Sequence, residues 1–421
     1  MLTTLRNAWK IPELRKKLLF TLFALLIYRF CNTIPVPYID VAALRNFYDS
    51  TLSTTILGLY NAMSGSAFSQ ASVLALSIQP YINASIILQL LTIAIPALER
   101  LAKEEGEEGK KKIERITRYT TVGLGLLMGW AYYMMISNTY GIVTEKGILP
   151  ALVIILTFTA GAAFVMWLGE QINEFGIGNG ISMILFANII SSIPGMVGTI
   201  SSMLWWQGIL VVVGIVLLIL FIVYINDAER RIPVQYAKRV VGRKVYGGQS
   251  TNMPIKVAMS GVMPVIFAQS IASVPATICA FAGVGNGNWW YDNVWSSNSW
   301  TYAVCYFLLI YFFSWFYSTI QYDPVEVANN LKKNGGFIPG FRPGKPTADF
   351  IKKVISKIVV FGAVYLSVVA LLPIVAGHLL ASVKNLAIGG TSVIIVVGVA
   401  LETVRALEAQ MMMRHYKGFL D

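Results

Sequence analysis

Long, unbroken apolar runs are the feature that most limits how this chain can fold. Ten such runs lie at 18–35, 71–95, 118–137, 148–169, 178–198, 204–225, 256–278, 301–320, 354–377 and 386–407. A helix needs about 20 apolar residues to cross the hydrocarbon core of a bilayer. Lipid offers no hydrogen-bond partners, and these runs lack the alternation of barrel strands. The sequence therefore predicts an all-α polytopic membrane protein with ten transmembrane helices.

The composition excludes a soluble fold and most kinds of chemistry. Charged residues make up only 13% of 421 positions, against about 25% in soluble domains. The three cysteines are scattered, and no pattern for a metal, a cofactor or a catalytic centre is evident. Glu170 and Glu402 lie near span ends rather than at mid-membrane, where ion-coupled transporters keep their carboxylates. We therefore expect no enzyme, no metal and no cofactor.

Basic residues predict the topology. Lys and Arg gather in the segments 1–17, 99–118, 226–256 and 321–357, whereas the opposite loops hold only Arg45, Lys146 and Lys384. The positive-inside rule then places both termini in the cytoplasm. Ten spans divide into five and five, so the second half enters the membrane inverted, with the functional site expected between the halves. The expected units are a cytoplasmic N-terminal segment 1–17, an N-terminal half 18–198, a C-terminal half 199–408 and a cytoplasmic tail 409–421.

Two cytoplasmic loops, 226–256 and 321–353, are longer than the topology requires. The first contains the alternating pattern IPVQYAKRVVGRKVYG, which predicts a protruding β-like hairpin with a Gly-Gly turn. The second is rich in Gly and Pro. Two interpretations stay open: the loops only fix the topology, or they form a docking surface for a cytoplasmic partner.

One weak segment, GLYNAMSGSAFSQA at 58–71, precedes the second span without a loop. It is too short and too polar to cross a bilayer. Its small and polar residues offer little apolar area to bury. We therefore expect a weakly held helix.

Five motifs occur in order along the chain: SIQPYINASIILQLL, MWLGEQINEFGIGNGIS, QSTNMPIKVAMSGVMPVIFAQSI, NNLKKNGGFIPGFRPG and GGTSVIIVV. Together they resemble the SecY family (Sec61/SecY), the large pore subunits of the bacterial Sec protein-conducting channel, from about residue 10 to residue 410. The resemblance implies a channel that passes unfolded, signal-bearing polypeptides across the cytoplasmic membrane and transmembrane segments sideways into it. The alternative is an inverted-repeat secondary transporter of a small solute.

The resemblance also implies roles for individual residues. The apolar pore ring comprises Ile78, Ile82, Ile181, Leu185, Ile266 and Ile395. The plug helix, at 58–71, includes Leu59, Tyr60, Asn61, Ala62, Met63, Ser64, Gly65, Ser66, Ala67, Phe68, Ser69 and Gln70. The lateral gate between the second and seventh spans carries the polar residues Asn83, Gln89, Gln269 and Ser270. Asn179 and Asn188 are assigned to the same polar interior.

The partners follow from the same resemblance, because the chain has no P-loop and needs an external source of energy. They are the SecA ATPase or a ribosome on the long cytoplasmic loops, the small subunits SecE and SecG, signal peptides, precursor or nascent chains, and membrane lipid. The expected docking residues are Arg342, Arg230, Arg231, Lys238, Arg239, Arg243 and Lys244.

Overall fold

The structure is a computed structural model. It describes residues 2–49, 56–103, 106–137, 142–145, 147–236, 239–241, 244–246, 250–258, 261–281, 294, 299–379 and 390–417. The helices are α1 Leu2–Lys10, α2 Pro12–Cys31, α3 Val41–Phe47, α4 Ile56–Met63, α5 Gln79–Ala94, α6 Pro96–Lys103, α7 Gly106–Ser137, α8 Ile148–Phe175, α9 Gly180–Ser191, α10 Ile193–Ser201, α11 Trp205–Asp227, α12 Met263–Phe281, α13 Trp300–Gln321, α14 Pro324–Lys333, α15 Lys345–Leu379 and α16 Gly390–Lys417. The strands are β1 Glu229–Tyr236, β2 Arg239–Val241, β3 Lys244–Tyr246, β4 Ser250–Lys256 and β5 Gly336–Phe337.

Every predicted span overlaps a helix. Among the described residues, five helical segments are long and apolar enough to cross a membrane, namely Ile148–Phe175, Gly180–Ser201, Trp205–Asp227, Trp300–Lys333 and Lys345–Gly377. A sixth is added if α5 and the adjoining Pro96–Ala102, bent by 107°, count as one span. The number of complete crossings stays a prediction.

Two predicted span boundaries are wrong. The second span was expected from residue 71, but α5 begins at Gln79, and residues 64–78 follow turns. The seventh was expected from residue 256, but that residue ends β4 and α12 begins at Met263. In both places the apolar run extends beyond the helix that it contains.

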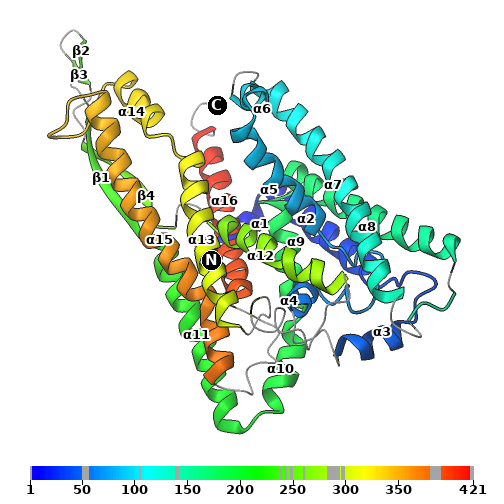
Figure 1. Cartoon of the computed structure of the whole chain (residues 1–421). Helices are drawn as coiled ribbons and strands as arrows, with labels where there is room; N and C mark the ends of the chain where they lie inside the picture. The colour runs from blue at the N-terminus through cyan, green and yellow to red at the C-terminus, as the bar shows by residue number, and fades with distance from the viewer. Residues whose placement is uncertain are drawn as a thin grey trace.

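The helices form two groups that meet along the centre of the molecule (Figure 1). One group contains α2, α5, α7 and α8, and the other contains α11, α13 and α15. Contacts between α9 and α16, and between α5 and α12, join the two groups. The largest buried apolar cluster draws on both, from Tyr28 in α2 to Leu401 in α16. The interior between the halves is therefore an apolar core.

Both long basic loops fold into one small unit, the loop unit. Strands β4, β1 and β5 form a sheet in that order, with antiparallel pairing throughout. Because β5 comes from the second loop, the Gln235–Phe337 pairing joins the two loops directly. A separate apolar core lies between this sheet and α14 and α15, and it includes Ile232, Ile338 and Ile351. The predicted hairpin is confirmed, whereas its Gly-Gly turn lies outside the described residues.

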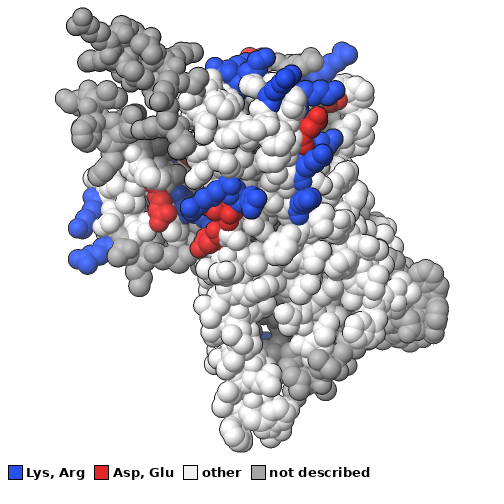
Figure 2. Space-filling view, turned by 90° about the vertical axis from the view of Figure 1, so that its left-hand side faces the viewer, with Lys and Arg blue, Asp and Glu red and all other residues white. Residues whose placement is uncertain are grey.

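Charge divides along the long direction of the molecule. On the face shown in Figure 2, the Lys, Arg, Asp and Glu side chains lie in the upper half, and the lower half is almost wholly uncharged. The upper end in Figure 1 carries α6, α14 and the loop strands. This separation is the one that basic cytoplasmic loops and an apolar membrane zone require.

Candidate functional site

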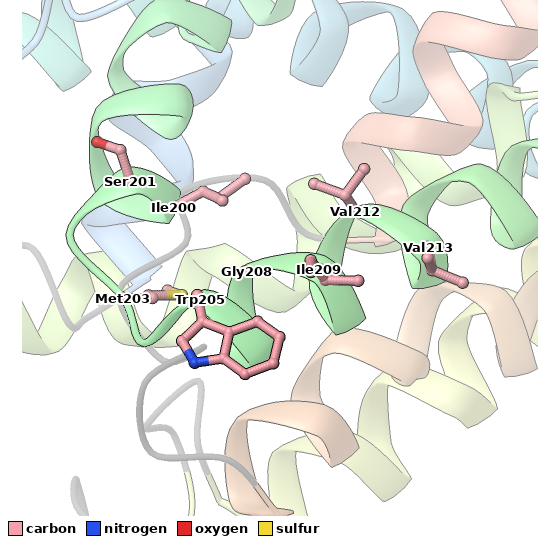
Figure 3. Close-up of a pocket in the computed structure, with 8 residues that line it drawn as sticks. All are labelled: Ile200, Ser201, Met203, Trp205, Gly208, Ile209, Val212 and Val213. Carbon is pink, nitrogen blue, oxygen red and sulfur yellow. The ribbon is translucent and has the colours of Figure 1, made fainter.

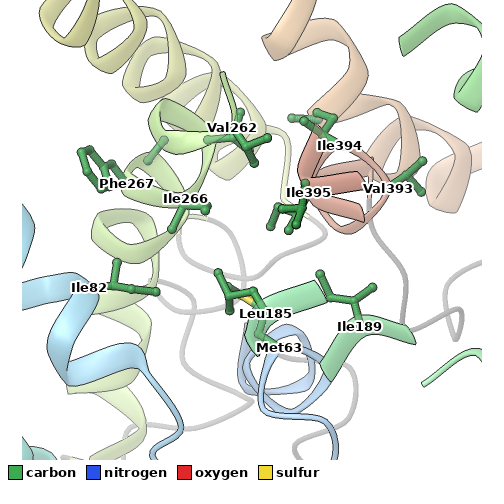
Figure 4. Close-up of a cluster of buried hydrophobic side chains, with 14 of the residues drawn as sticks. Met63, Ile82, Leu185, Ile189, Val262, Ile266, Phe267, Val393, Ile394 and Ile395 are labelled. Carbon is green, nitrogen blue, oxygen red and sulfur yellow. The ribbon is translucent and has the colours of Figure 1, made fainter. Parts of the chain in front are cut away.

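A cluster of buried apolar side chains lies where the two helix groups meet, at the place of the predicted constriction. Four helices contribute the six predicted ring residues: α5 or its N-cap gives Ile78 and Ile82, α9 gives Ile181 and Leu185, α12 gives Ile266, and α16 gives Ile395. Five of them are at most 3% exposed and belong to one cluster, and Ile181 is half-buried and packs against it. Figure 4 shows Ile82, Leu185, Ile266 and Ile395 converging from the four helices. The structure thus brings these predicted residues together.

Helix periodicity and close packing position these side chains. Ile78 and Ile82, like Ile181 and Leu185, stand four residues apart and therefore share a helix face. A Cβ added at Gly169 of α8 would lie 3.7 Å from Ile78 Cδ1 and 3.9 Å from Ile181 Cγ1. These two residues therefore also pack against α8. One turn further along, Ile86 and Ile189 are buried in the same cluster, so the apolar lining is deeper than six residues.

The plug segment differs from the predicted helix. Only its first part is helical, because α4 ends at Met63 and residues 64–71 form turns. Gly65, Ser66 and Ala71 have positive φ angles of 66°, 69° and 42°. Side chains also replace helical hydrogen bonds here: Ser64 Oγ accepts from the Phe68 backbone N–H, and Asn61 Oδ1 accepts from that of Ser69. Short polar side chains that bond to the backbone compete with helix formation in this way.

The expectation that the plug is weakly held is also wrong. Met63, Ala67 and Phe68 are 6%, 0% and 4% exposed. The Phe68 ring packs edge-on against Tyr60 and Tyr132, at centroid distances of 5.2 and 4.7 Å. Tyr132 Oη also donates a 2.7 Å hydrogen bond to the Phe68 carbonyl. The aromatic body of Phe68 supplies the buried area that the small residues around it lack.

Polar side chains from neighbouring helices bind the backbone at the end of α4. Asn188 donates to the Met63 carbonyl, and Arg29 donates to the Gly65 carbonyl. Asn32 donates to the carbonyls of both Ser64 and Gly65. Asn188, which was assigned to the polar interior, is fully buried. Asn179 instead caps α9, because its side-chain oxygen accepts from the backbone N–H groups of Ile181 and Ser182. Met63 itself reaches the apolar constriction (Figure 4).

The contact between α5 and α12 contains a buried polar pair. Gln79 Nε2 donates a 3.2 Å hydrogen bond to Ser270 Oγ, and both residues are buried. Gln269 is 7% exposed, and among the described residues its Oε1 has no hydrogen-bond partner. Of the other predicted gate residues, Asn83 is half-buried, while Gln89 is exposed and donates to Ser85 of its own helix. Gln79 was missed, because it stands one residue before Pro80 at the start of a span.

The predicted docking residues lie on the loop unit as far as it is described. Arg342 is exposed on the turn between α14 and α15, where its carbonyl accepts a 2.8 Å hydrogen bond from Thr347 Oγ1. Arg230 and Arg231 are exposed on β1, and Arg231 pairs with Glu229 at 2.7 Å. Arg239 and Lys244 begin β2 and β3, whereas Lys238 and Arg243 lie outside the described residues.

Electrostatic coupling continues from this unit towards the helices. Burial lowers the pKa of Lys256 at the end of β4, and the positive charge of Arg405 lowers it further. Arg405 Nη2 donates at 2.6 Å to Asp227 Oδ1 of α11. The ion pair joins α16 to α11, and beside it the Val257 backbone N–H, directly after β4, donates a 2.9 Å hydrogen bond to the Ala228 carbonyl after α11.

A cavity of about 430 Å³ lies apart from the constriction, at the junction of α10 and α11. Its lining includes Ile200, Trp205, Ile209 and Val212 and carries no charge (Figure 3). No group of three or more His, Cys, Asp or Glu residues that could hold a metal occurs in the described part of the chain.

Comparison with known proteins identifies the family. The SecY family model matches residues 72–404. The protein translocase subunit SecY of Streptomyces scabiei is 44% identical over 438 residues, covering 100% of both chains. A structure on the plug domain of the SecY protein, described as stabilising the closed state of the translocation channel and maintaining a membrane seal, is 18% identical, with a TM-score of 0.66 over 94% of this chain and 92% of that one. Sec61 in the canine ribosome–channel complex of the endoplasmic reticulum is 16% identical, with a TM-score of 0.63 over the same shares. On the family model and the full-length relative, this all-α, multi-pass membrane chain belongs to the SecY family.

Proposed function

We propose that the chain is the central channel subunit of a protein translocase. It passes unfolded, signal-bearing polypeptides across the cytoplasmic membrane of a bacterium and releases transmembrane segments sideways into the lipid. Both termini lie in the cytoplasm. The observation that carries this proposal is the constriction itself, where buried aliphatic side chains from both halves meet around Met63 of the plug segment.

The constriction is suited to a pore that must seal without binding its substrate. A ring of aliphatic side chains repels water, and a narrow apolar passage gates by dewetting. The same side chains offer a polypeptide no hydrogen bonds and no charges. The ring therefore tolerates any sequence that passes, as sequence-independent transport requires.

The plug supplies a second barrier below the ring. Its Met63 side chain belongs to the same buried apolar cluster as the ring residues, and its backbone is bonded to α2 and α9. The described SecY structure, whose plug domain stabilises the closed state, supports the same role for residues 58–71 here.

Sideways release requires α5 and α12 to separate. The contact between them is held by the buried Gln79–Ser270 hydrogen bond and leaves Gln269 Oε1 unsatisfied. An unsatisfied buried acceptor weakens the closed arrangement by about 1–3 kcal/mol. An apolar signal helix can therefore replace this contact at modest cost.

Partners provide the energy, and the chain itself catalyses no reaction. The exposed Arg342, Arg230 and Arg231 suit an acidic surface of SecA or the phosphates of ribosomal RNA. Arg239, Lys244, Lys238 and Arg243 would extend this basic surface. SecE and SecG complete the membrane complex, and lipid surrounds it.

The alternative, a secondary transporter of a small solute, is not favoured. The family model and the full-length relative belong to protein translocases. The constriction also offers a solute no polar ligands, because its lining is aliphatic.

ATP-driven transport in proteoliposomes tests the proposal. The full chain, reconstituted with SecE, SecG and SecA, should move a signal-bearing precursor into the vesicles. Arg342→Glu should lower the rate at least tenfold without loss of membrane insertion, because its charge would repel an acidic or phosphate-lined surface. Lys352→Glu, an exposed charge reversal on α15, is the matched control. An inactive parent complex would refute the proposed function, and a fully active Arg342→Glu variant would refute the docking role.

A further inference from the structure

The end of α4 is bound in a way that the proposed plug does not by itself require. The last carbonyl groups of a helix have no partners within it. Here three consecutive carbonyls accept from side chains of other helices. Asn188 Nδ2 lies 2.8 Å from Met63 O, Arg29 Nη1 lies 3.0 Å from Gly65 O, and Asn32 Nδ2 lies 3.4 and 3.2 Å from Ser64 O and Gly65 O.

All three donors come from the first half of the molecule. Arg29 and Asn32 stand at the end of α2, and Asn188 stands on α9. A helix C-terminus carries partial negative charge, which a guanidinium and two amide N–H groups complement. Asn188 and Asn32 are 0% and 3% exposed, so their bonds to the plug lie away from water. Buried hydrogen bonds of this kind are costly to leave unmade.

Asn188 is the best fixed of the three. Its Nδ2 also lies 2.9 Å from Tyr28 Oη and 3.4 Å from Ser77 Oγ, and these two hydroxyls are 3.2 Å apart. Its Oδ1 is buried and, among the described residues, has no hydrogen-bond partner. Displacement of α4 would let water reach this oxygen. Asn188 therefore has two opposite effects. Its Nδ2 holds the plug, whereas hydration of its Oδ1 on displacement offsets part of the free-energy cost of release.

We propose that Asn188, Arg29 and Asn32 form a polar latch on the end of α4, and that this latch sets how strong a signal segment must be before the channel opens. The inference rests on the proposed function. Because the latch joins the plug only to the first half, it opposes plug displacement whether or not α5 and α12 have separated. Weakening it should therefore make the closed state easier to leave.

Two variants test the latch in the reconstituted complex. Asn188→Leu keeps a similar volume without a donor, and Arg29→Met keeps an unbranched side chain without the charge. Each should raise the resting conductance in planar bilayers by about five- to tenfold. Each should raise the transport of a precursor with a defective signal by a similar factor, because the plug loses about one hydrogen bond. Ser192→Ala is the matched control on α9, because its hydroxyl donates to the Ile189 carbonyl of its own helix.

A plug deletion decides where the variants act. In a chain lacking residues 58–65, Asn188→Leu should add no further leak, since the carbonyls that it binds are gone. If Asn188→Leu raises the conductance by the same factor with and without the plug, the latch is overturned. It is also overturned if Asn188→Leu and Arg29→Met both keep the parent's resting conductance and signal requirement. If Asn188→Leu does not insert, the exposed Arg29→Met decides alone. A plug deletion that leaves conductance unchanged would instead count against the proposed function.

Discussion

At the scale of single residues, Gly65 allows the plug to approach the first half. It has a φ of 66°, and a Cβ there would lie 2.8 Å from Asn188 Oδ1 and 2.9 Å from Arg29 Nη1. We predict that Gly65→Ala lowers the thermal midpoint of the purified complex by a few degrees and raises resting ion leak. The left-handed conformation alone costs a residue with a Cβ about 1–2 kcal/mol. Scanning fluorimetry and bilayer conductance provide the two measurements.

The matched control is Gly198→Ala on α10, where a Cβ would meet nothing within 4 Å. This change should leave both measurements unaltered or slightly increase stability, because Ala favours a helix. A Gly65→Ala complex as stable and as tight as the parent would show that the close approach is unimportant.

Sequence predicted single residues unevenly. The ring residues were implied by the family resemblance, motif by motif, and the structure brings them together in one apolar cluster. Gln89 was predicted at the gate between α5 and α12, but it bonds to Ser85 of its own helix, and Gln79 makes the hydrogen bond to α12. Ten residues along a helix turn through about 1000°, so Gln89 points about 80° away from Gln79. Only knowledge of which face meets α12 could have separated the two residues.

At the scale of elements, the contact between α5 and α12 can be locked. We predict that cysteines at positions 79 and 270, in a chain whose Cys31, Cys279 and Cys305 are serines, block transport when joined. A glutamine is longer than a cysteine, so a short bis(methanethiosulfonate) reagent should replace a direct disulfide. It forms one disulfide with each cysteine thiol and releases methanesulfinate, and reduction cleaves both bonds. Transport is measured with the precursor assay, before and after reduction.

Each single cysteine treated with the same reagent serves as the control and should remain active. Reduction should restore transport to the doubly substituted chain. Complete cross-linking with undiminished transport would show that α5 and α12 need not separate.

Elements were predicted well where one apolar run makes one helix, and poorly where the chain turns inside such a run. Residues 64–71 were predicted as the end of the plug helix and residues 71–78 as the start of a span, yet Gly65, Ser66, Ala71 and Ser77 all have positive φ. These turns are stabilised by partners distant in sequence, such as Tyr132 and Asn188. No local pattern reports such partners.

At the scale of the whole molecule, the sequence predicted two cytoplasmic loops but not their union. The β1–β5 pairing joins Tyr236 to Gly336, and a shared apolar core lies beneath it. Pairing across such a separation leaves no short-range signal. Arg342 therefore stands on a folded unit that packs against α15, and not on an isolated loop.

The two barriers predict a molecule whose seal is partly redundant. Deleting residues 58–65 removes Met63 from the constriction, but the aliphatic residues of α5, α9, α12 and α16 remain. We predict flickering conductance with transport retained. Replacing Ile78, Ile82 and Ile181 with serine should let water wet the constriction and should also loosen the signal requirement, because a weakened closed state needs less binding energy to open.

A chain with both changes should have a resting conductance far above the sum of the two single increases. In each single variant the remaining barrier, the plug or the apolar ring, still excludes water and ions. Planar-bilayer conductance of the complex measures this, and serines at the lipid-exposed Val212, Val213 and Val216 of α11 provide the matched control. If the isoleucines were only packing residues, the triple-serine variant would lose stability without a selective leak. A well-folded triple-serine variant as tight as the parent would show that water is excluded elsewhere, and the constriction would no longer be the seal.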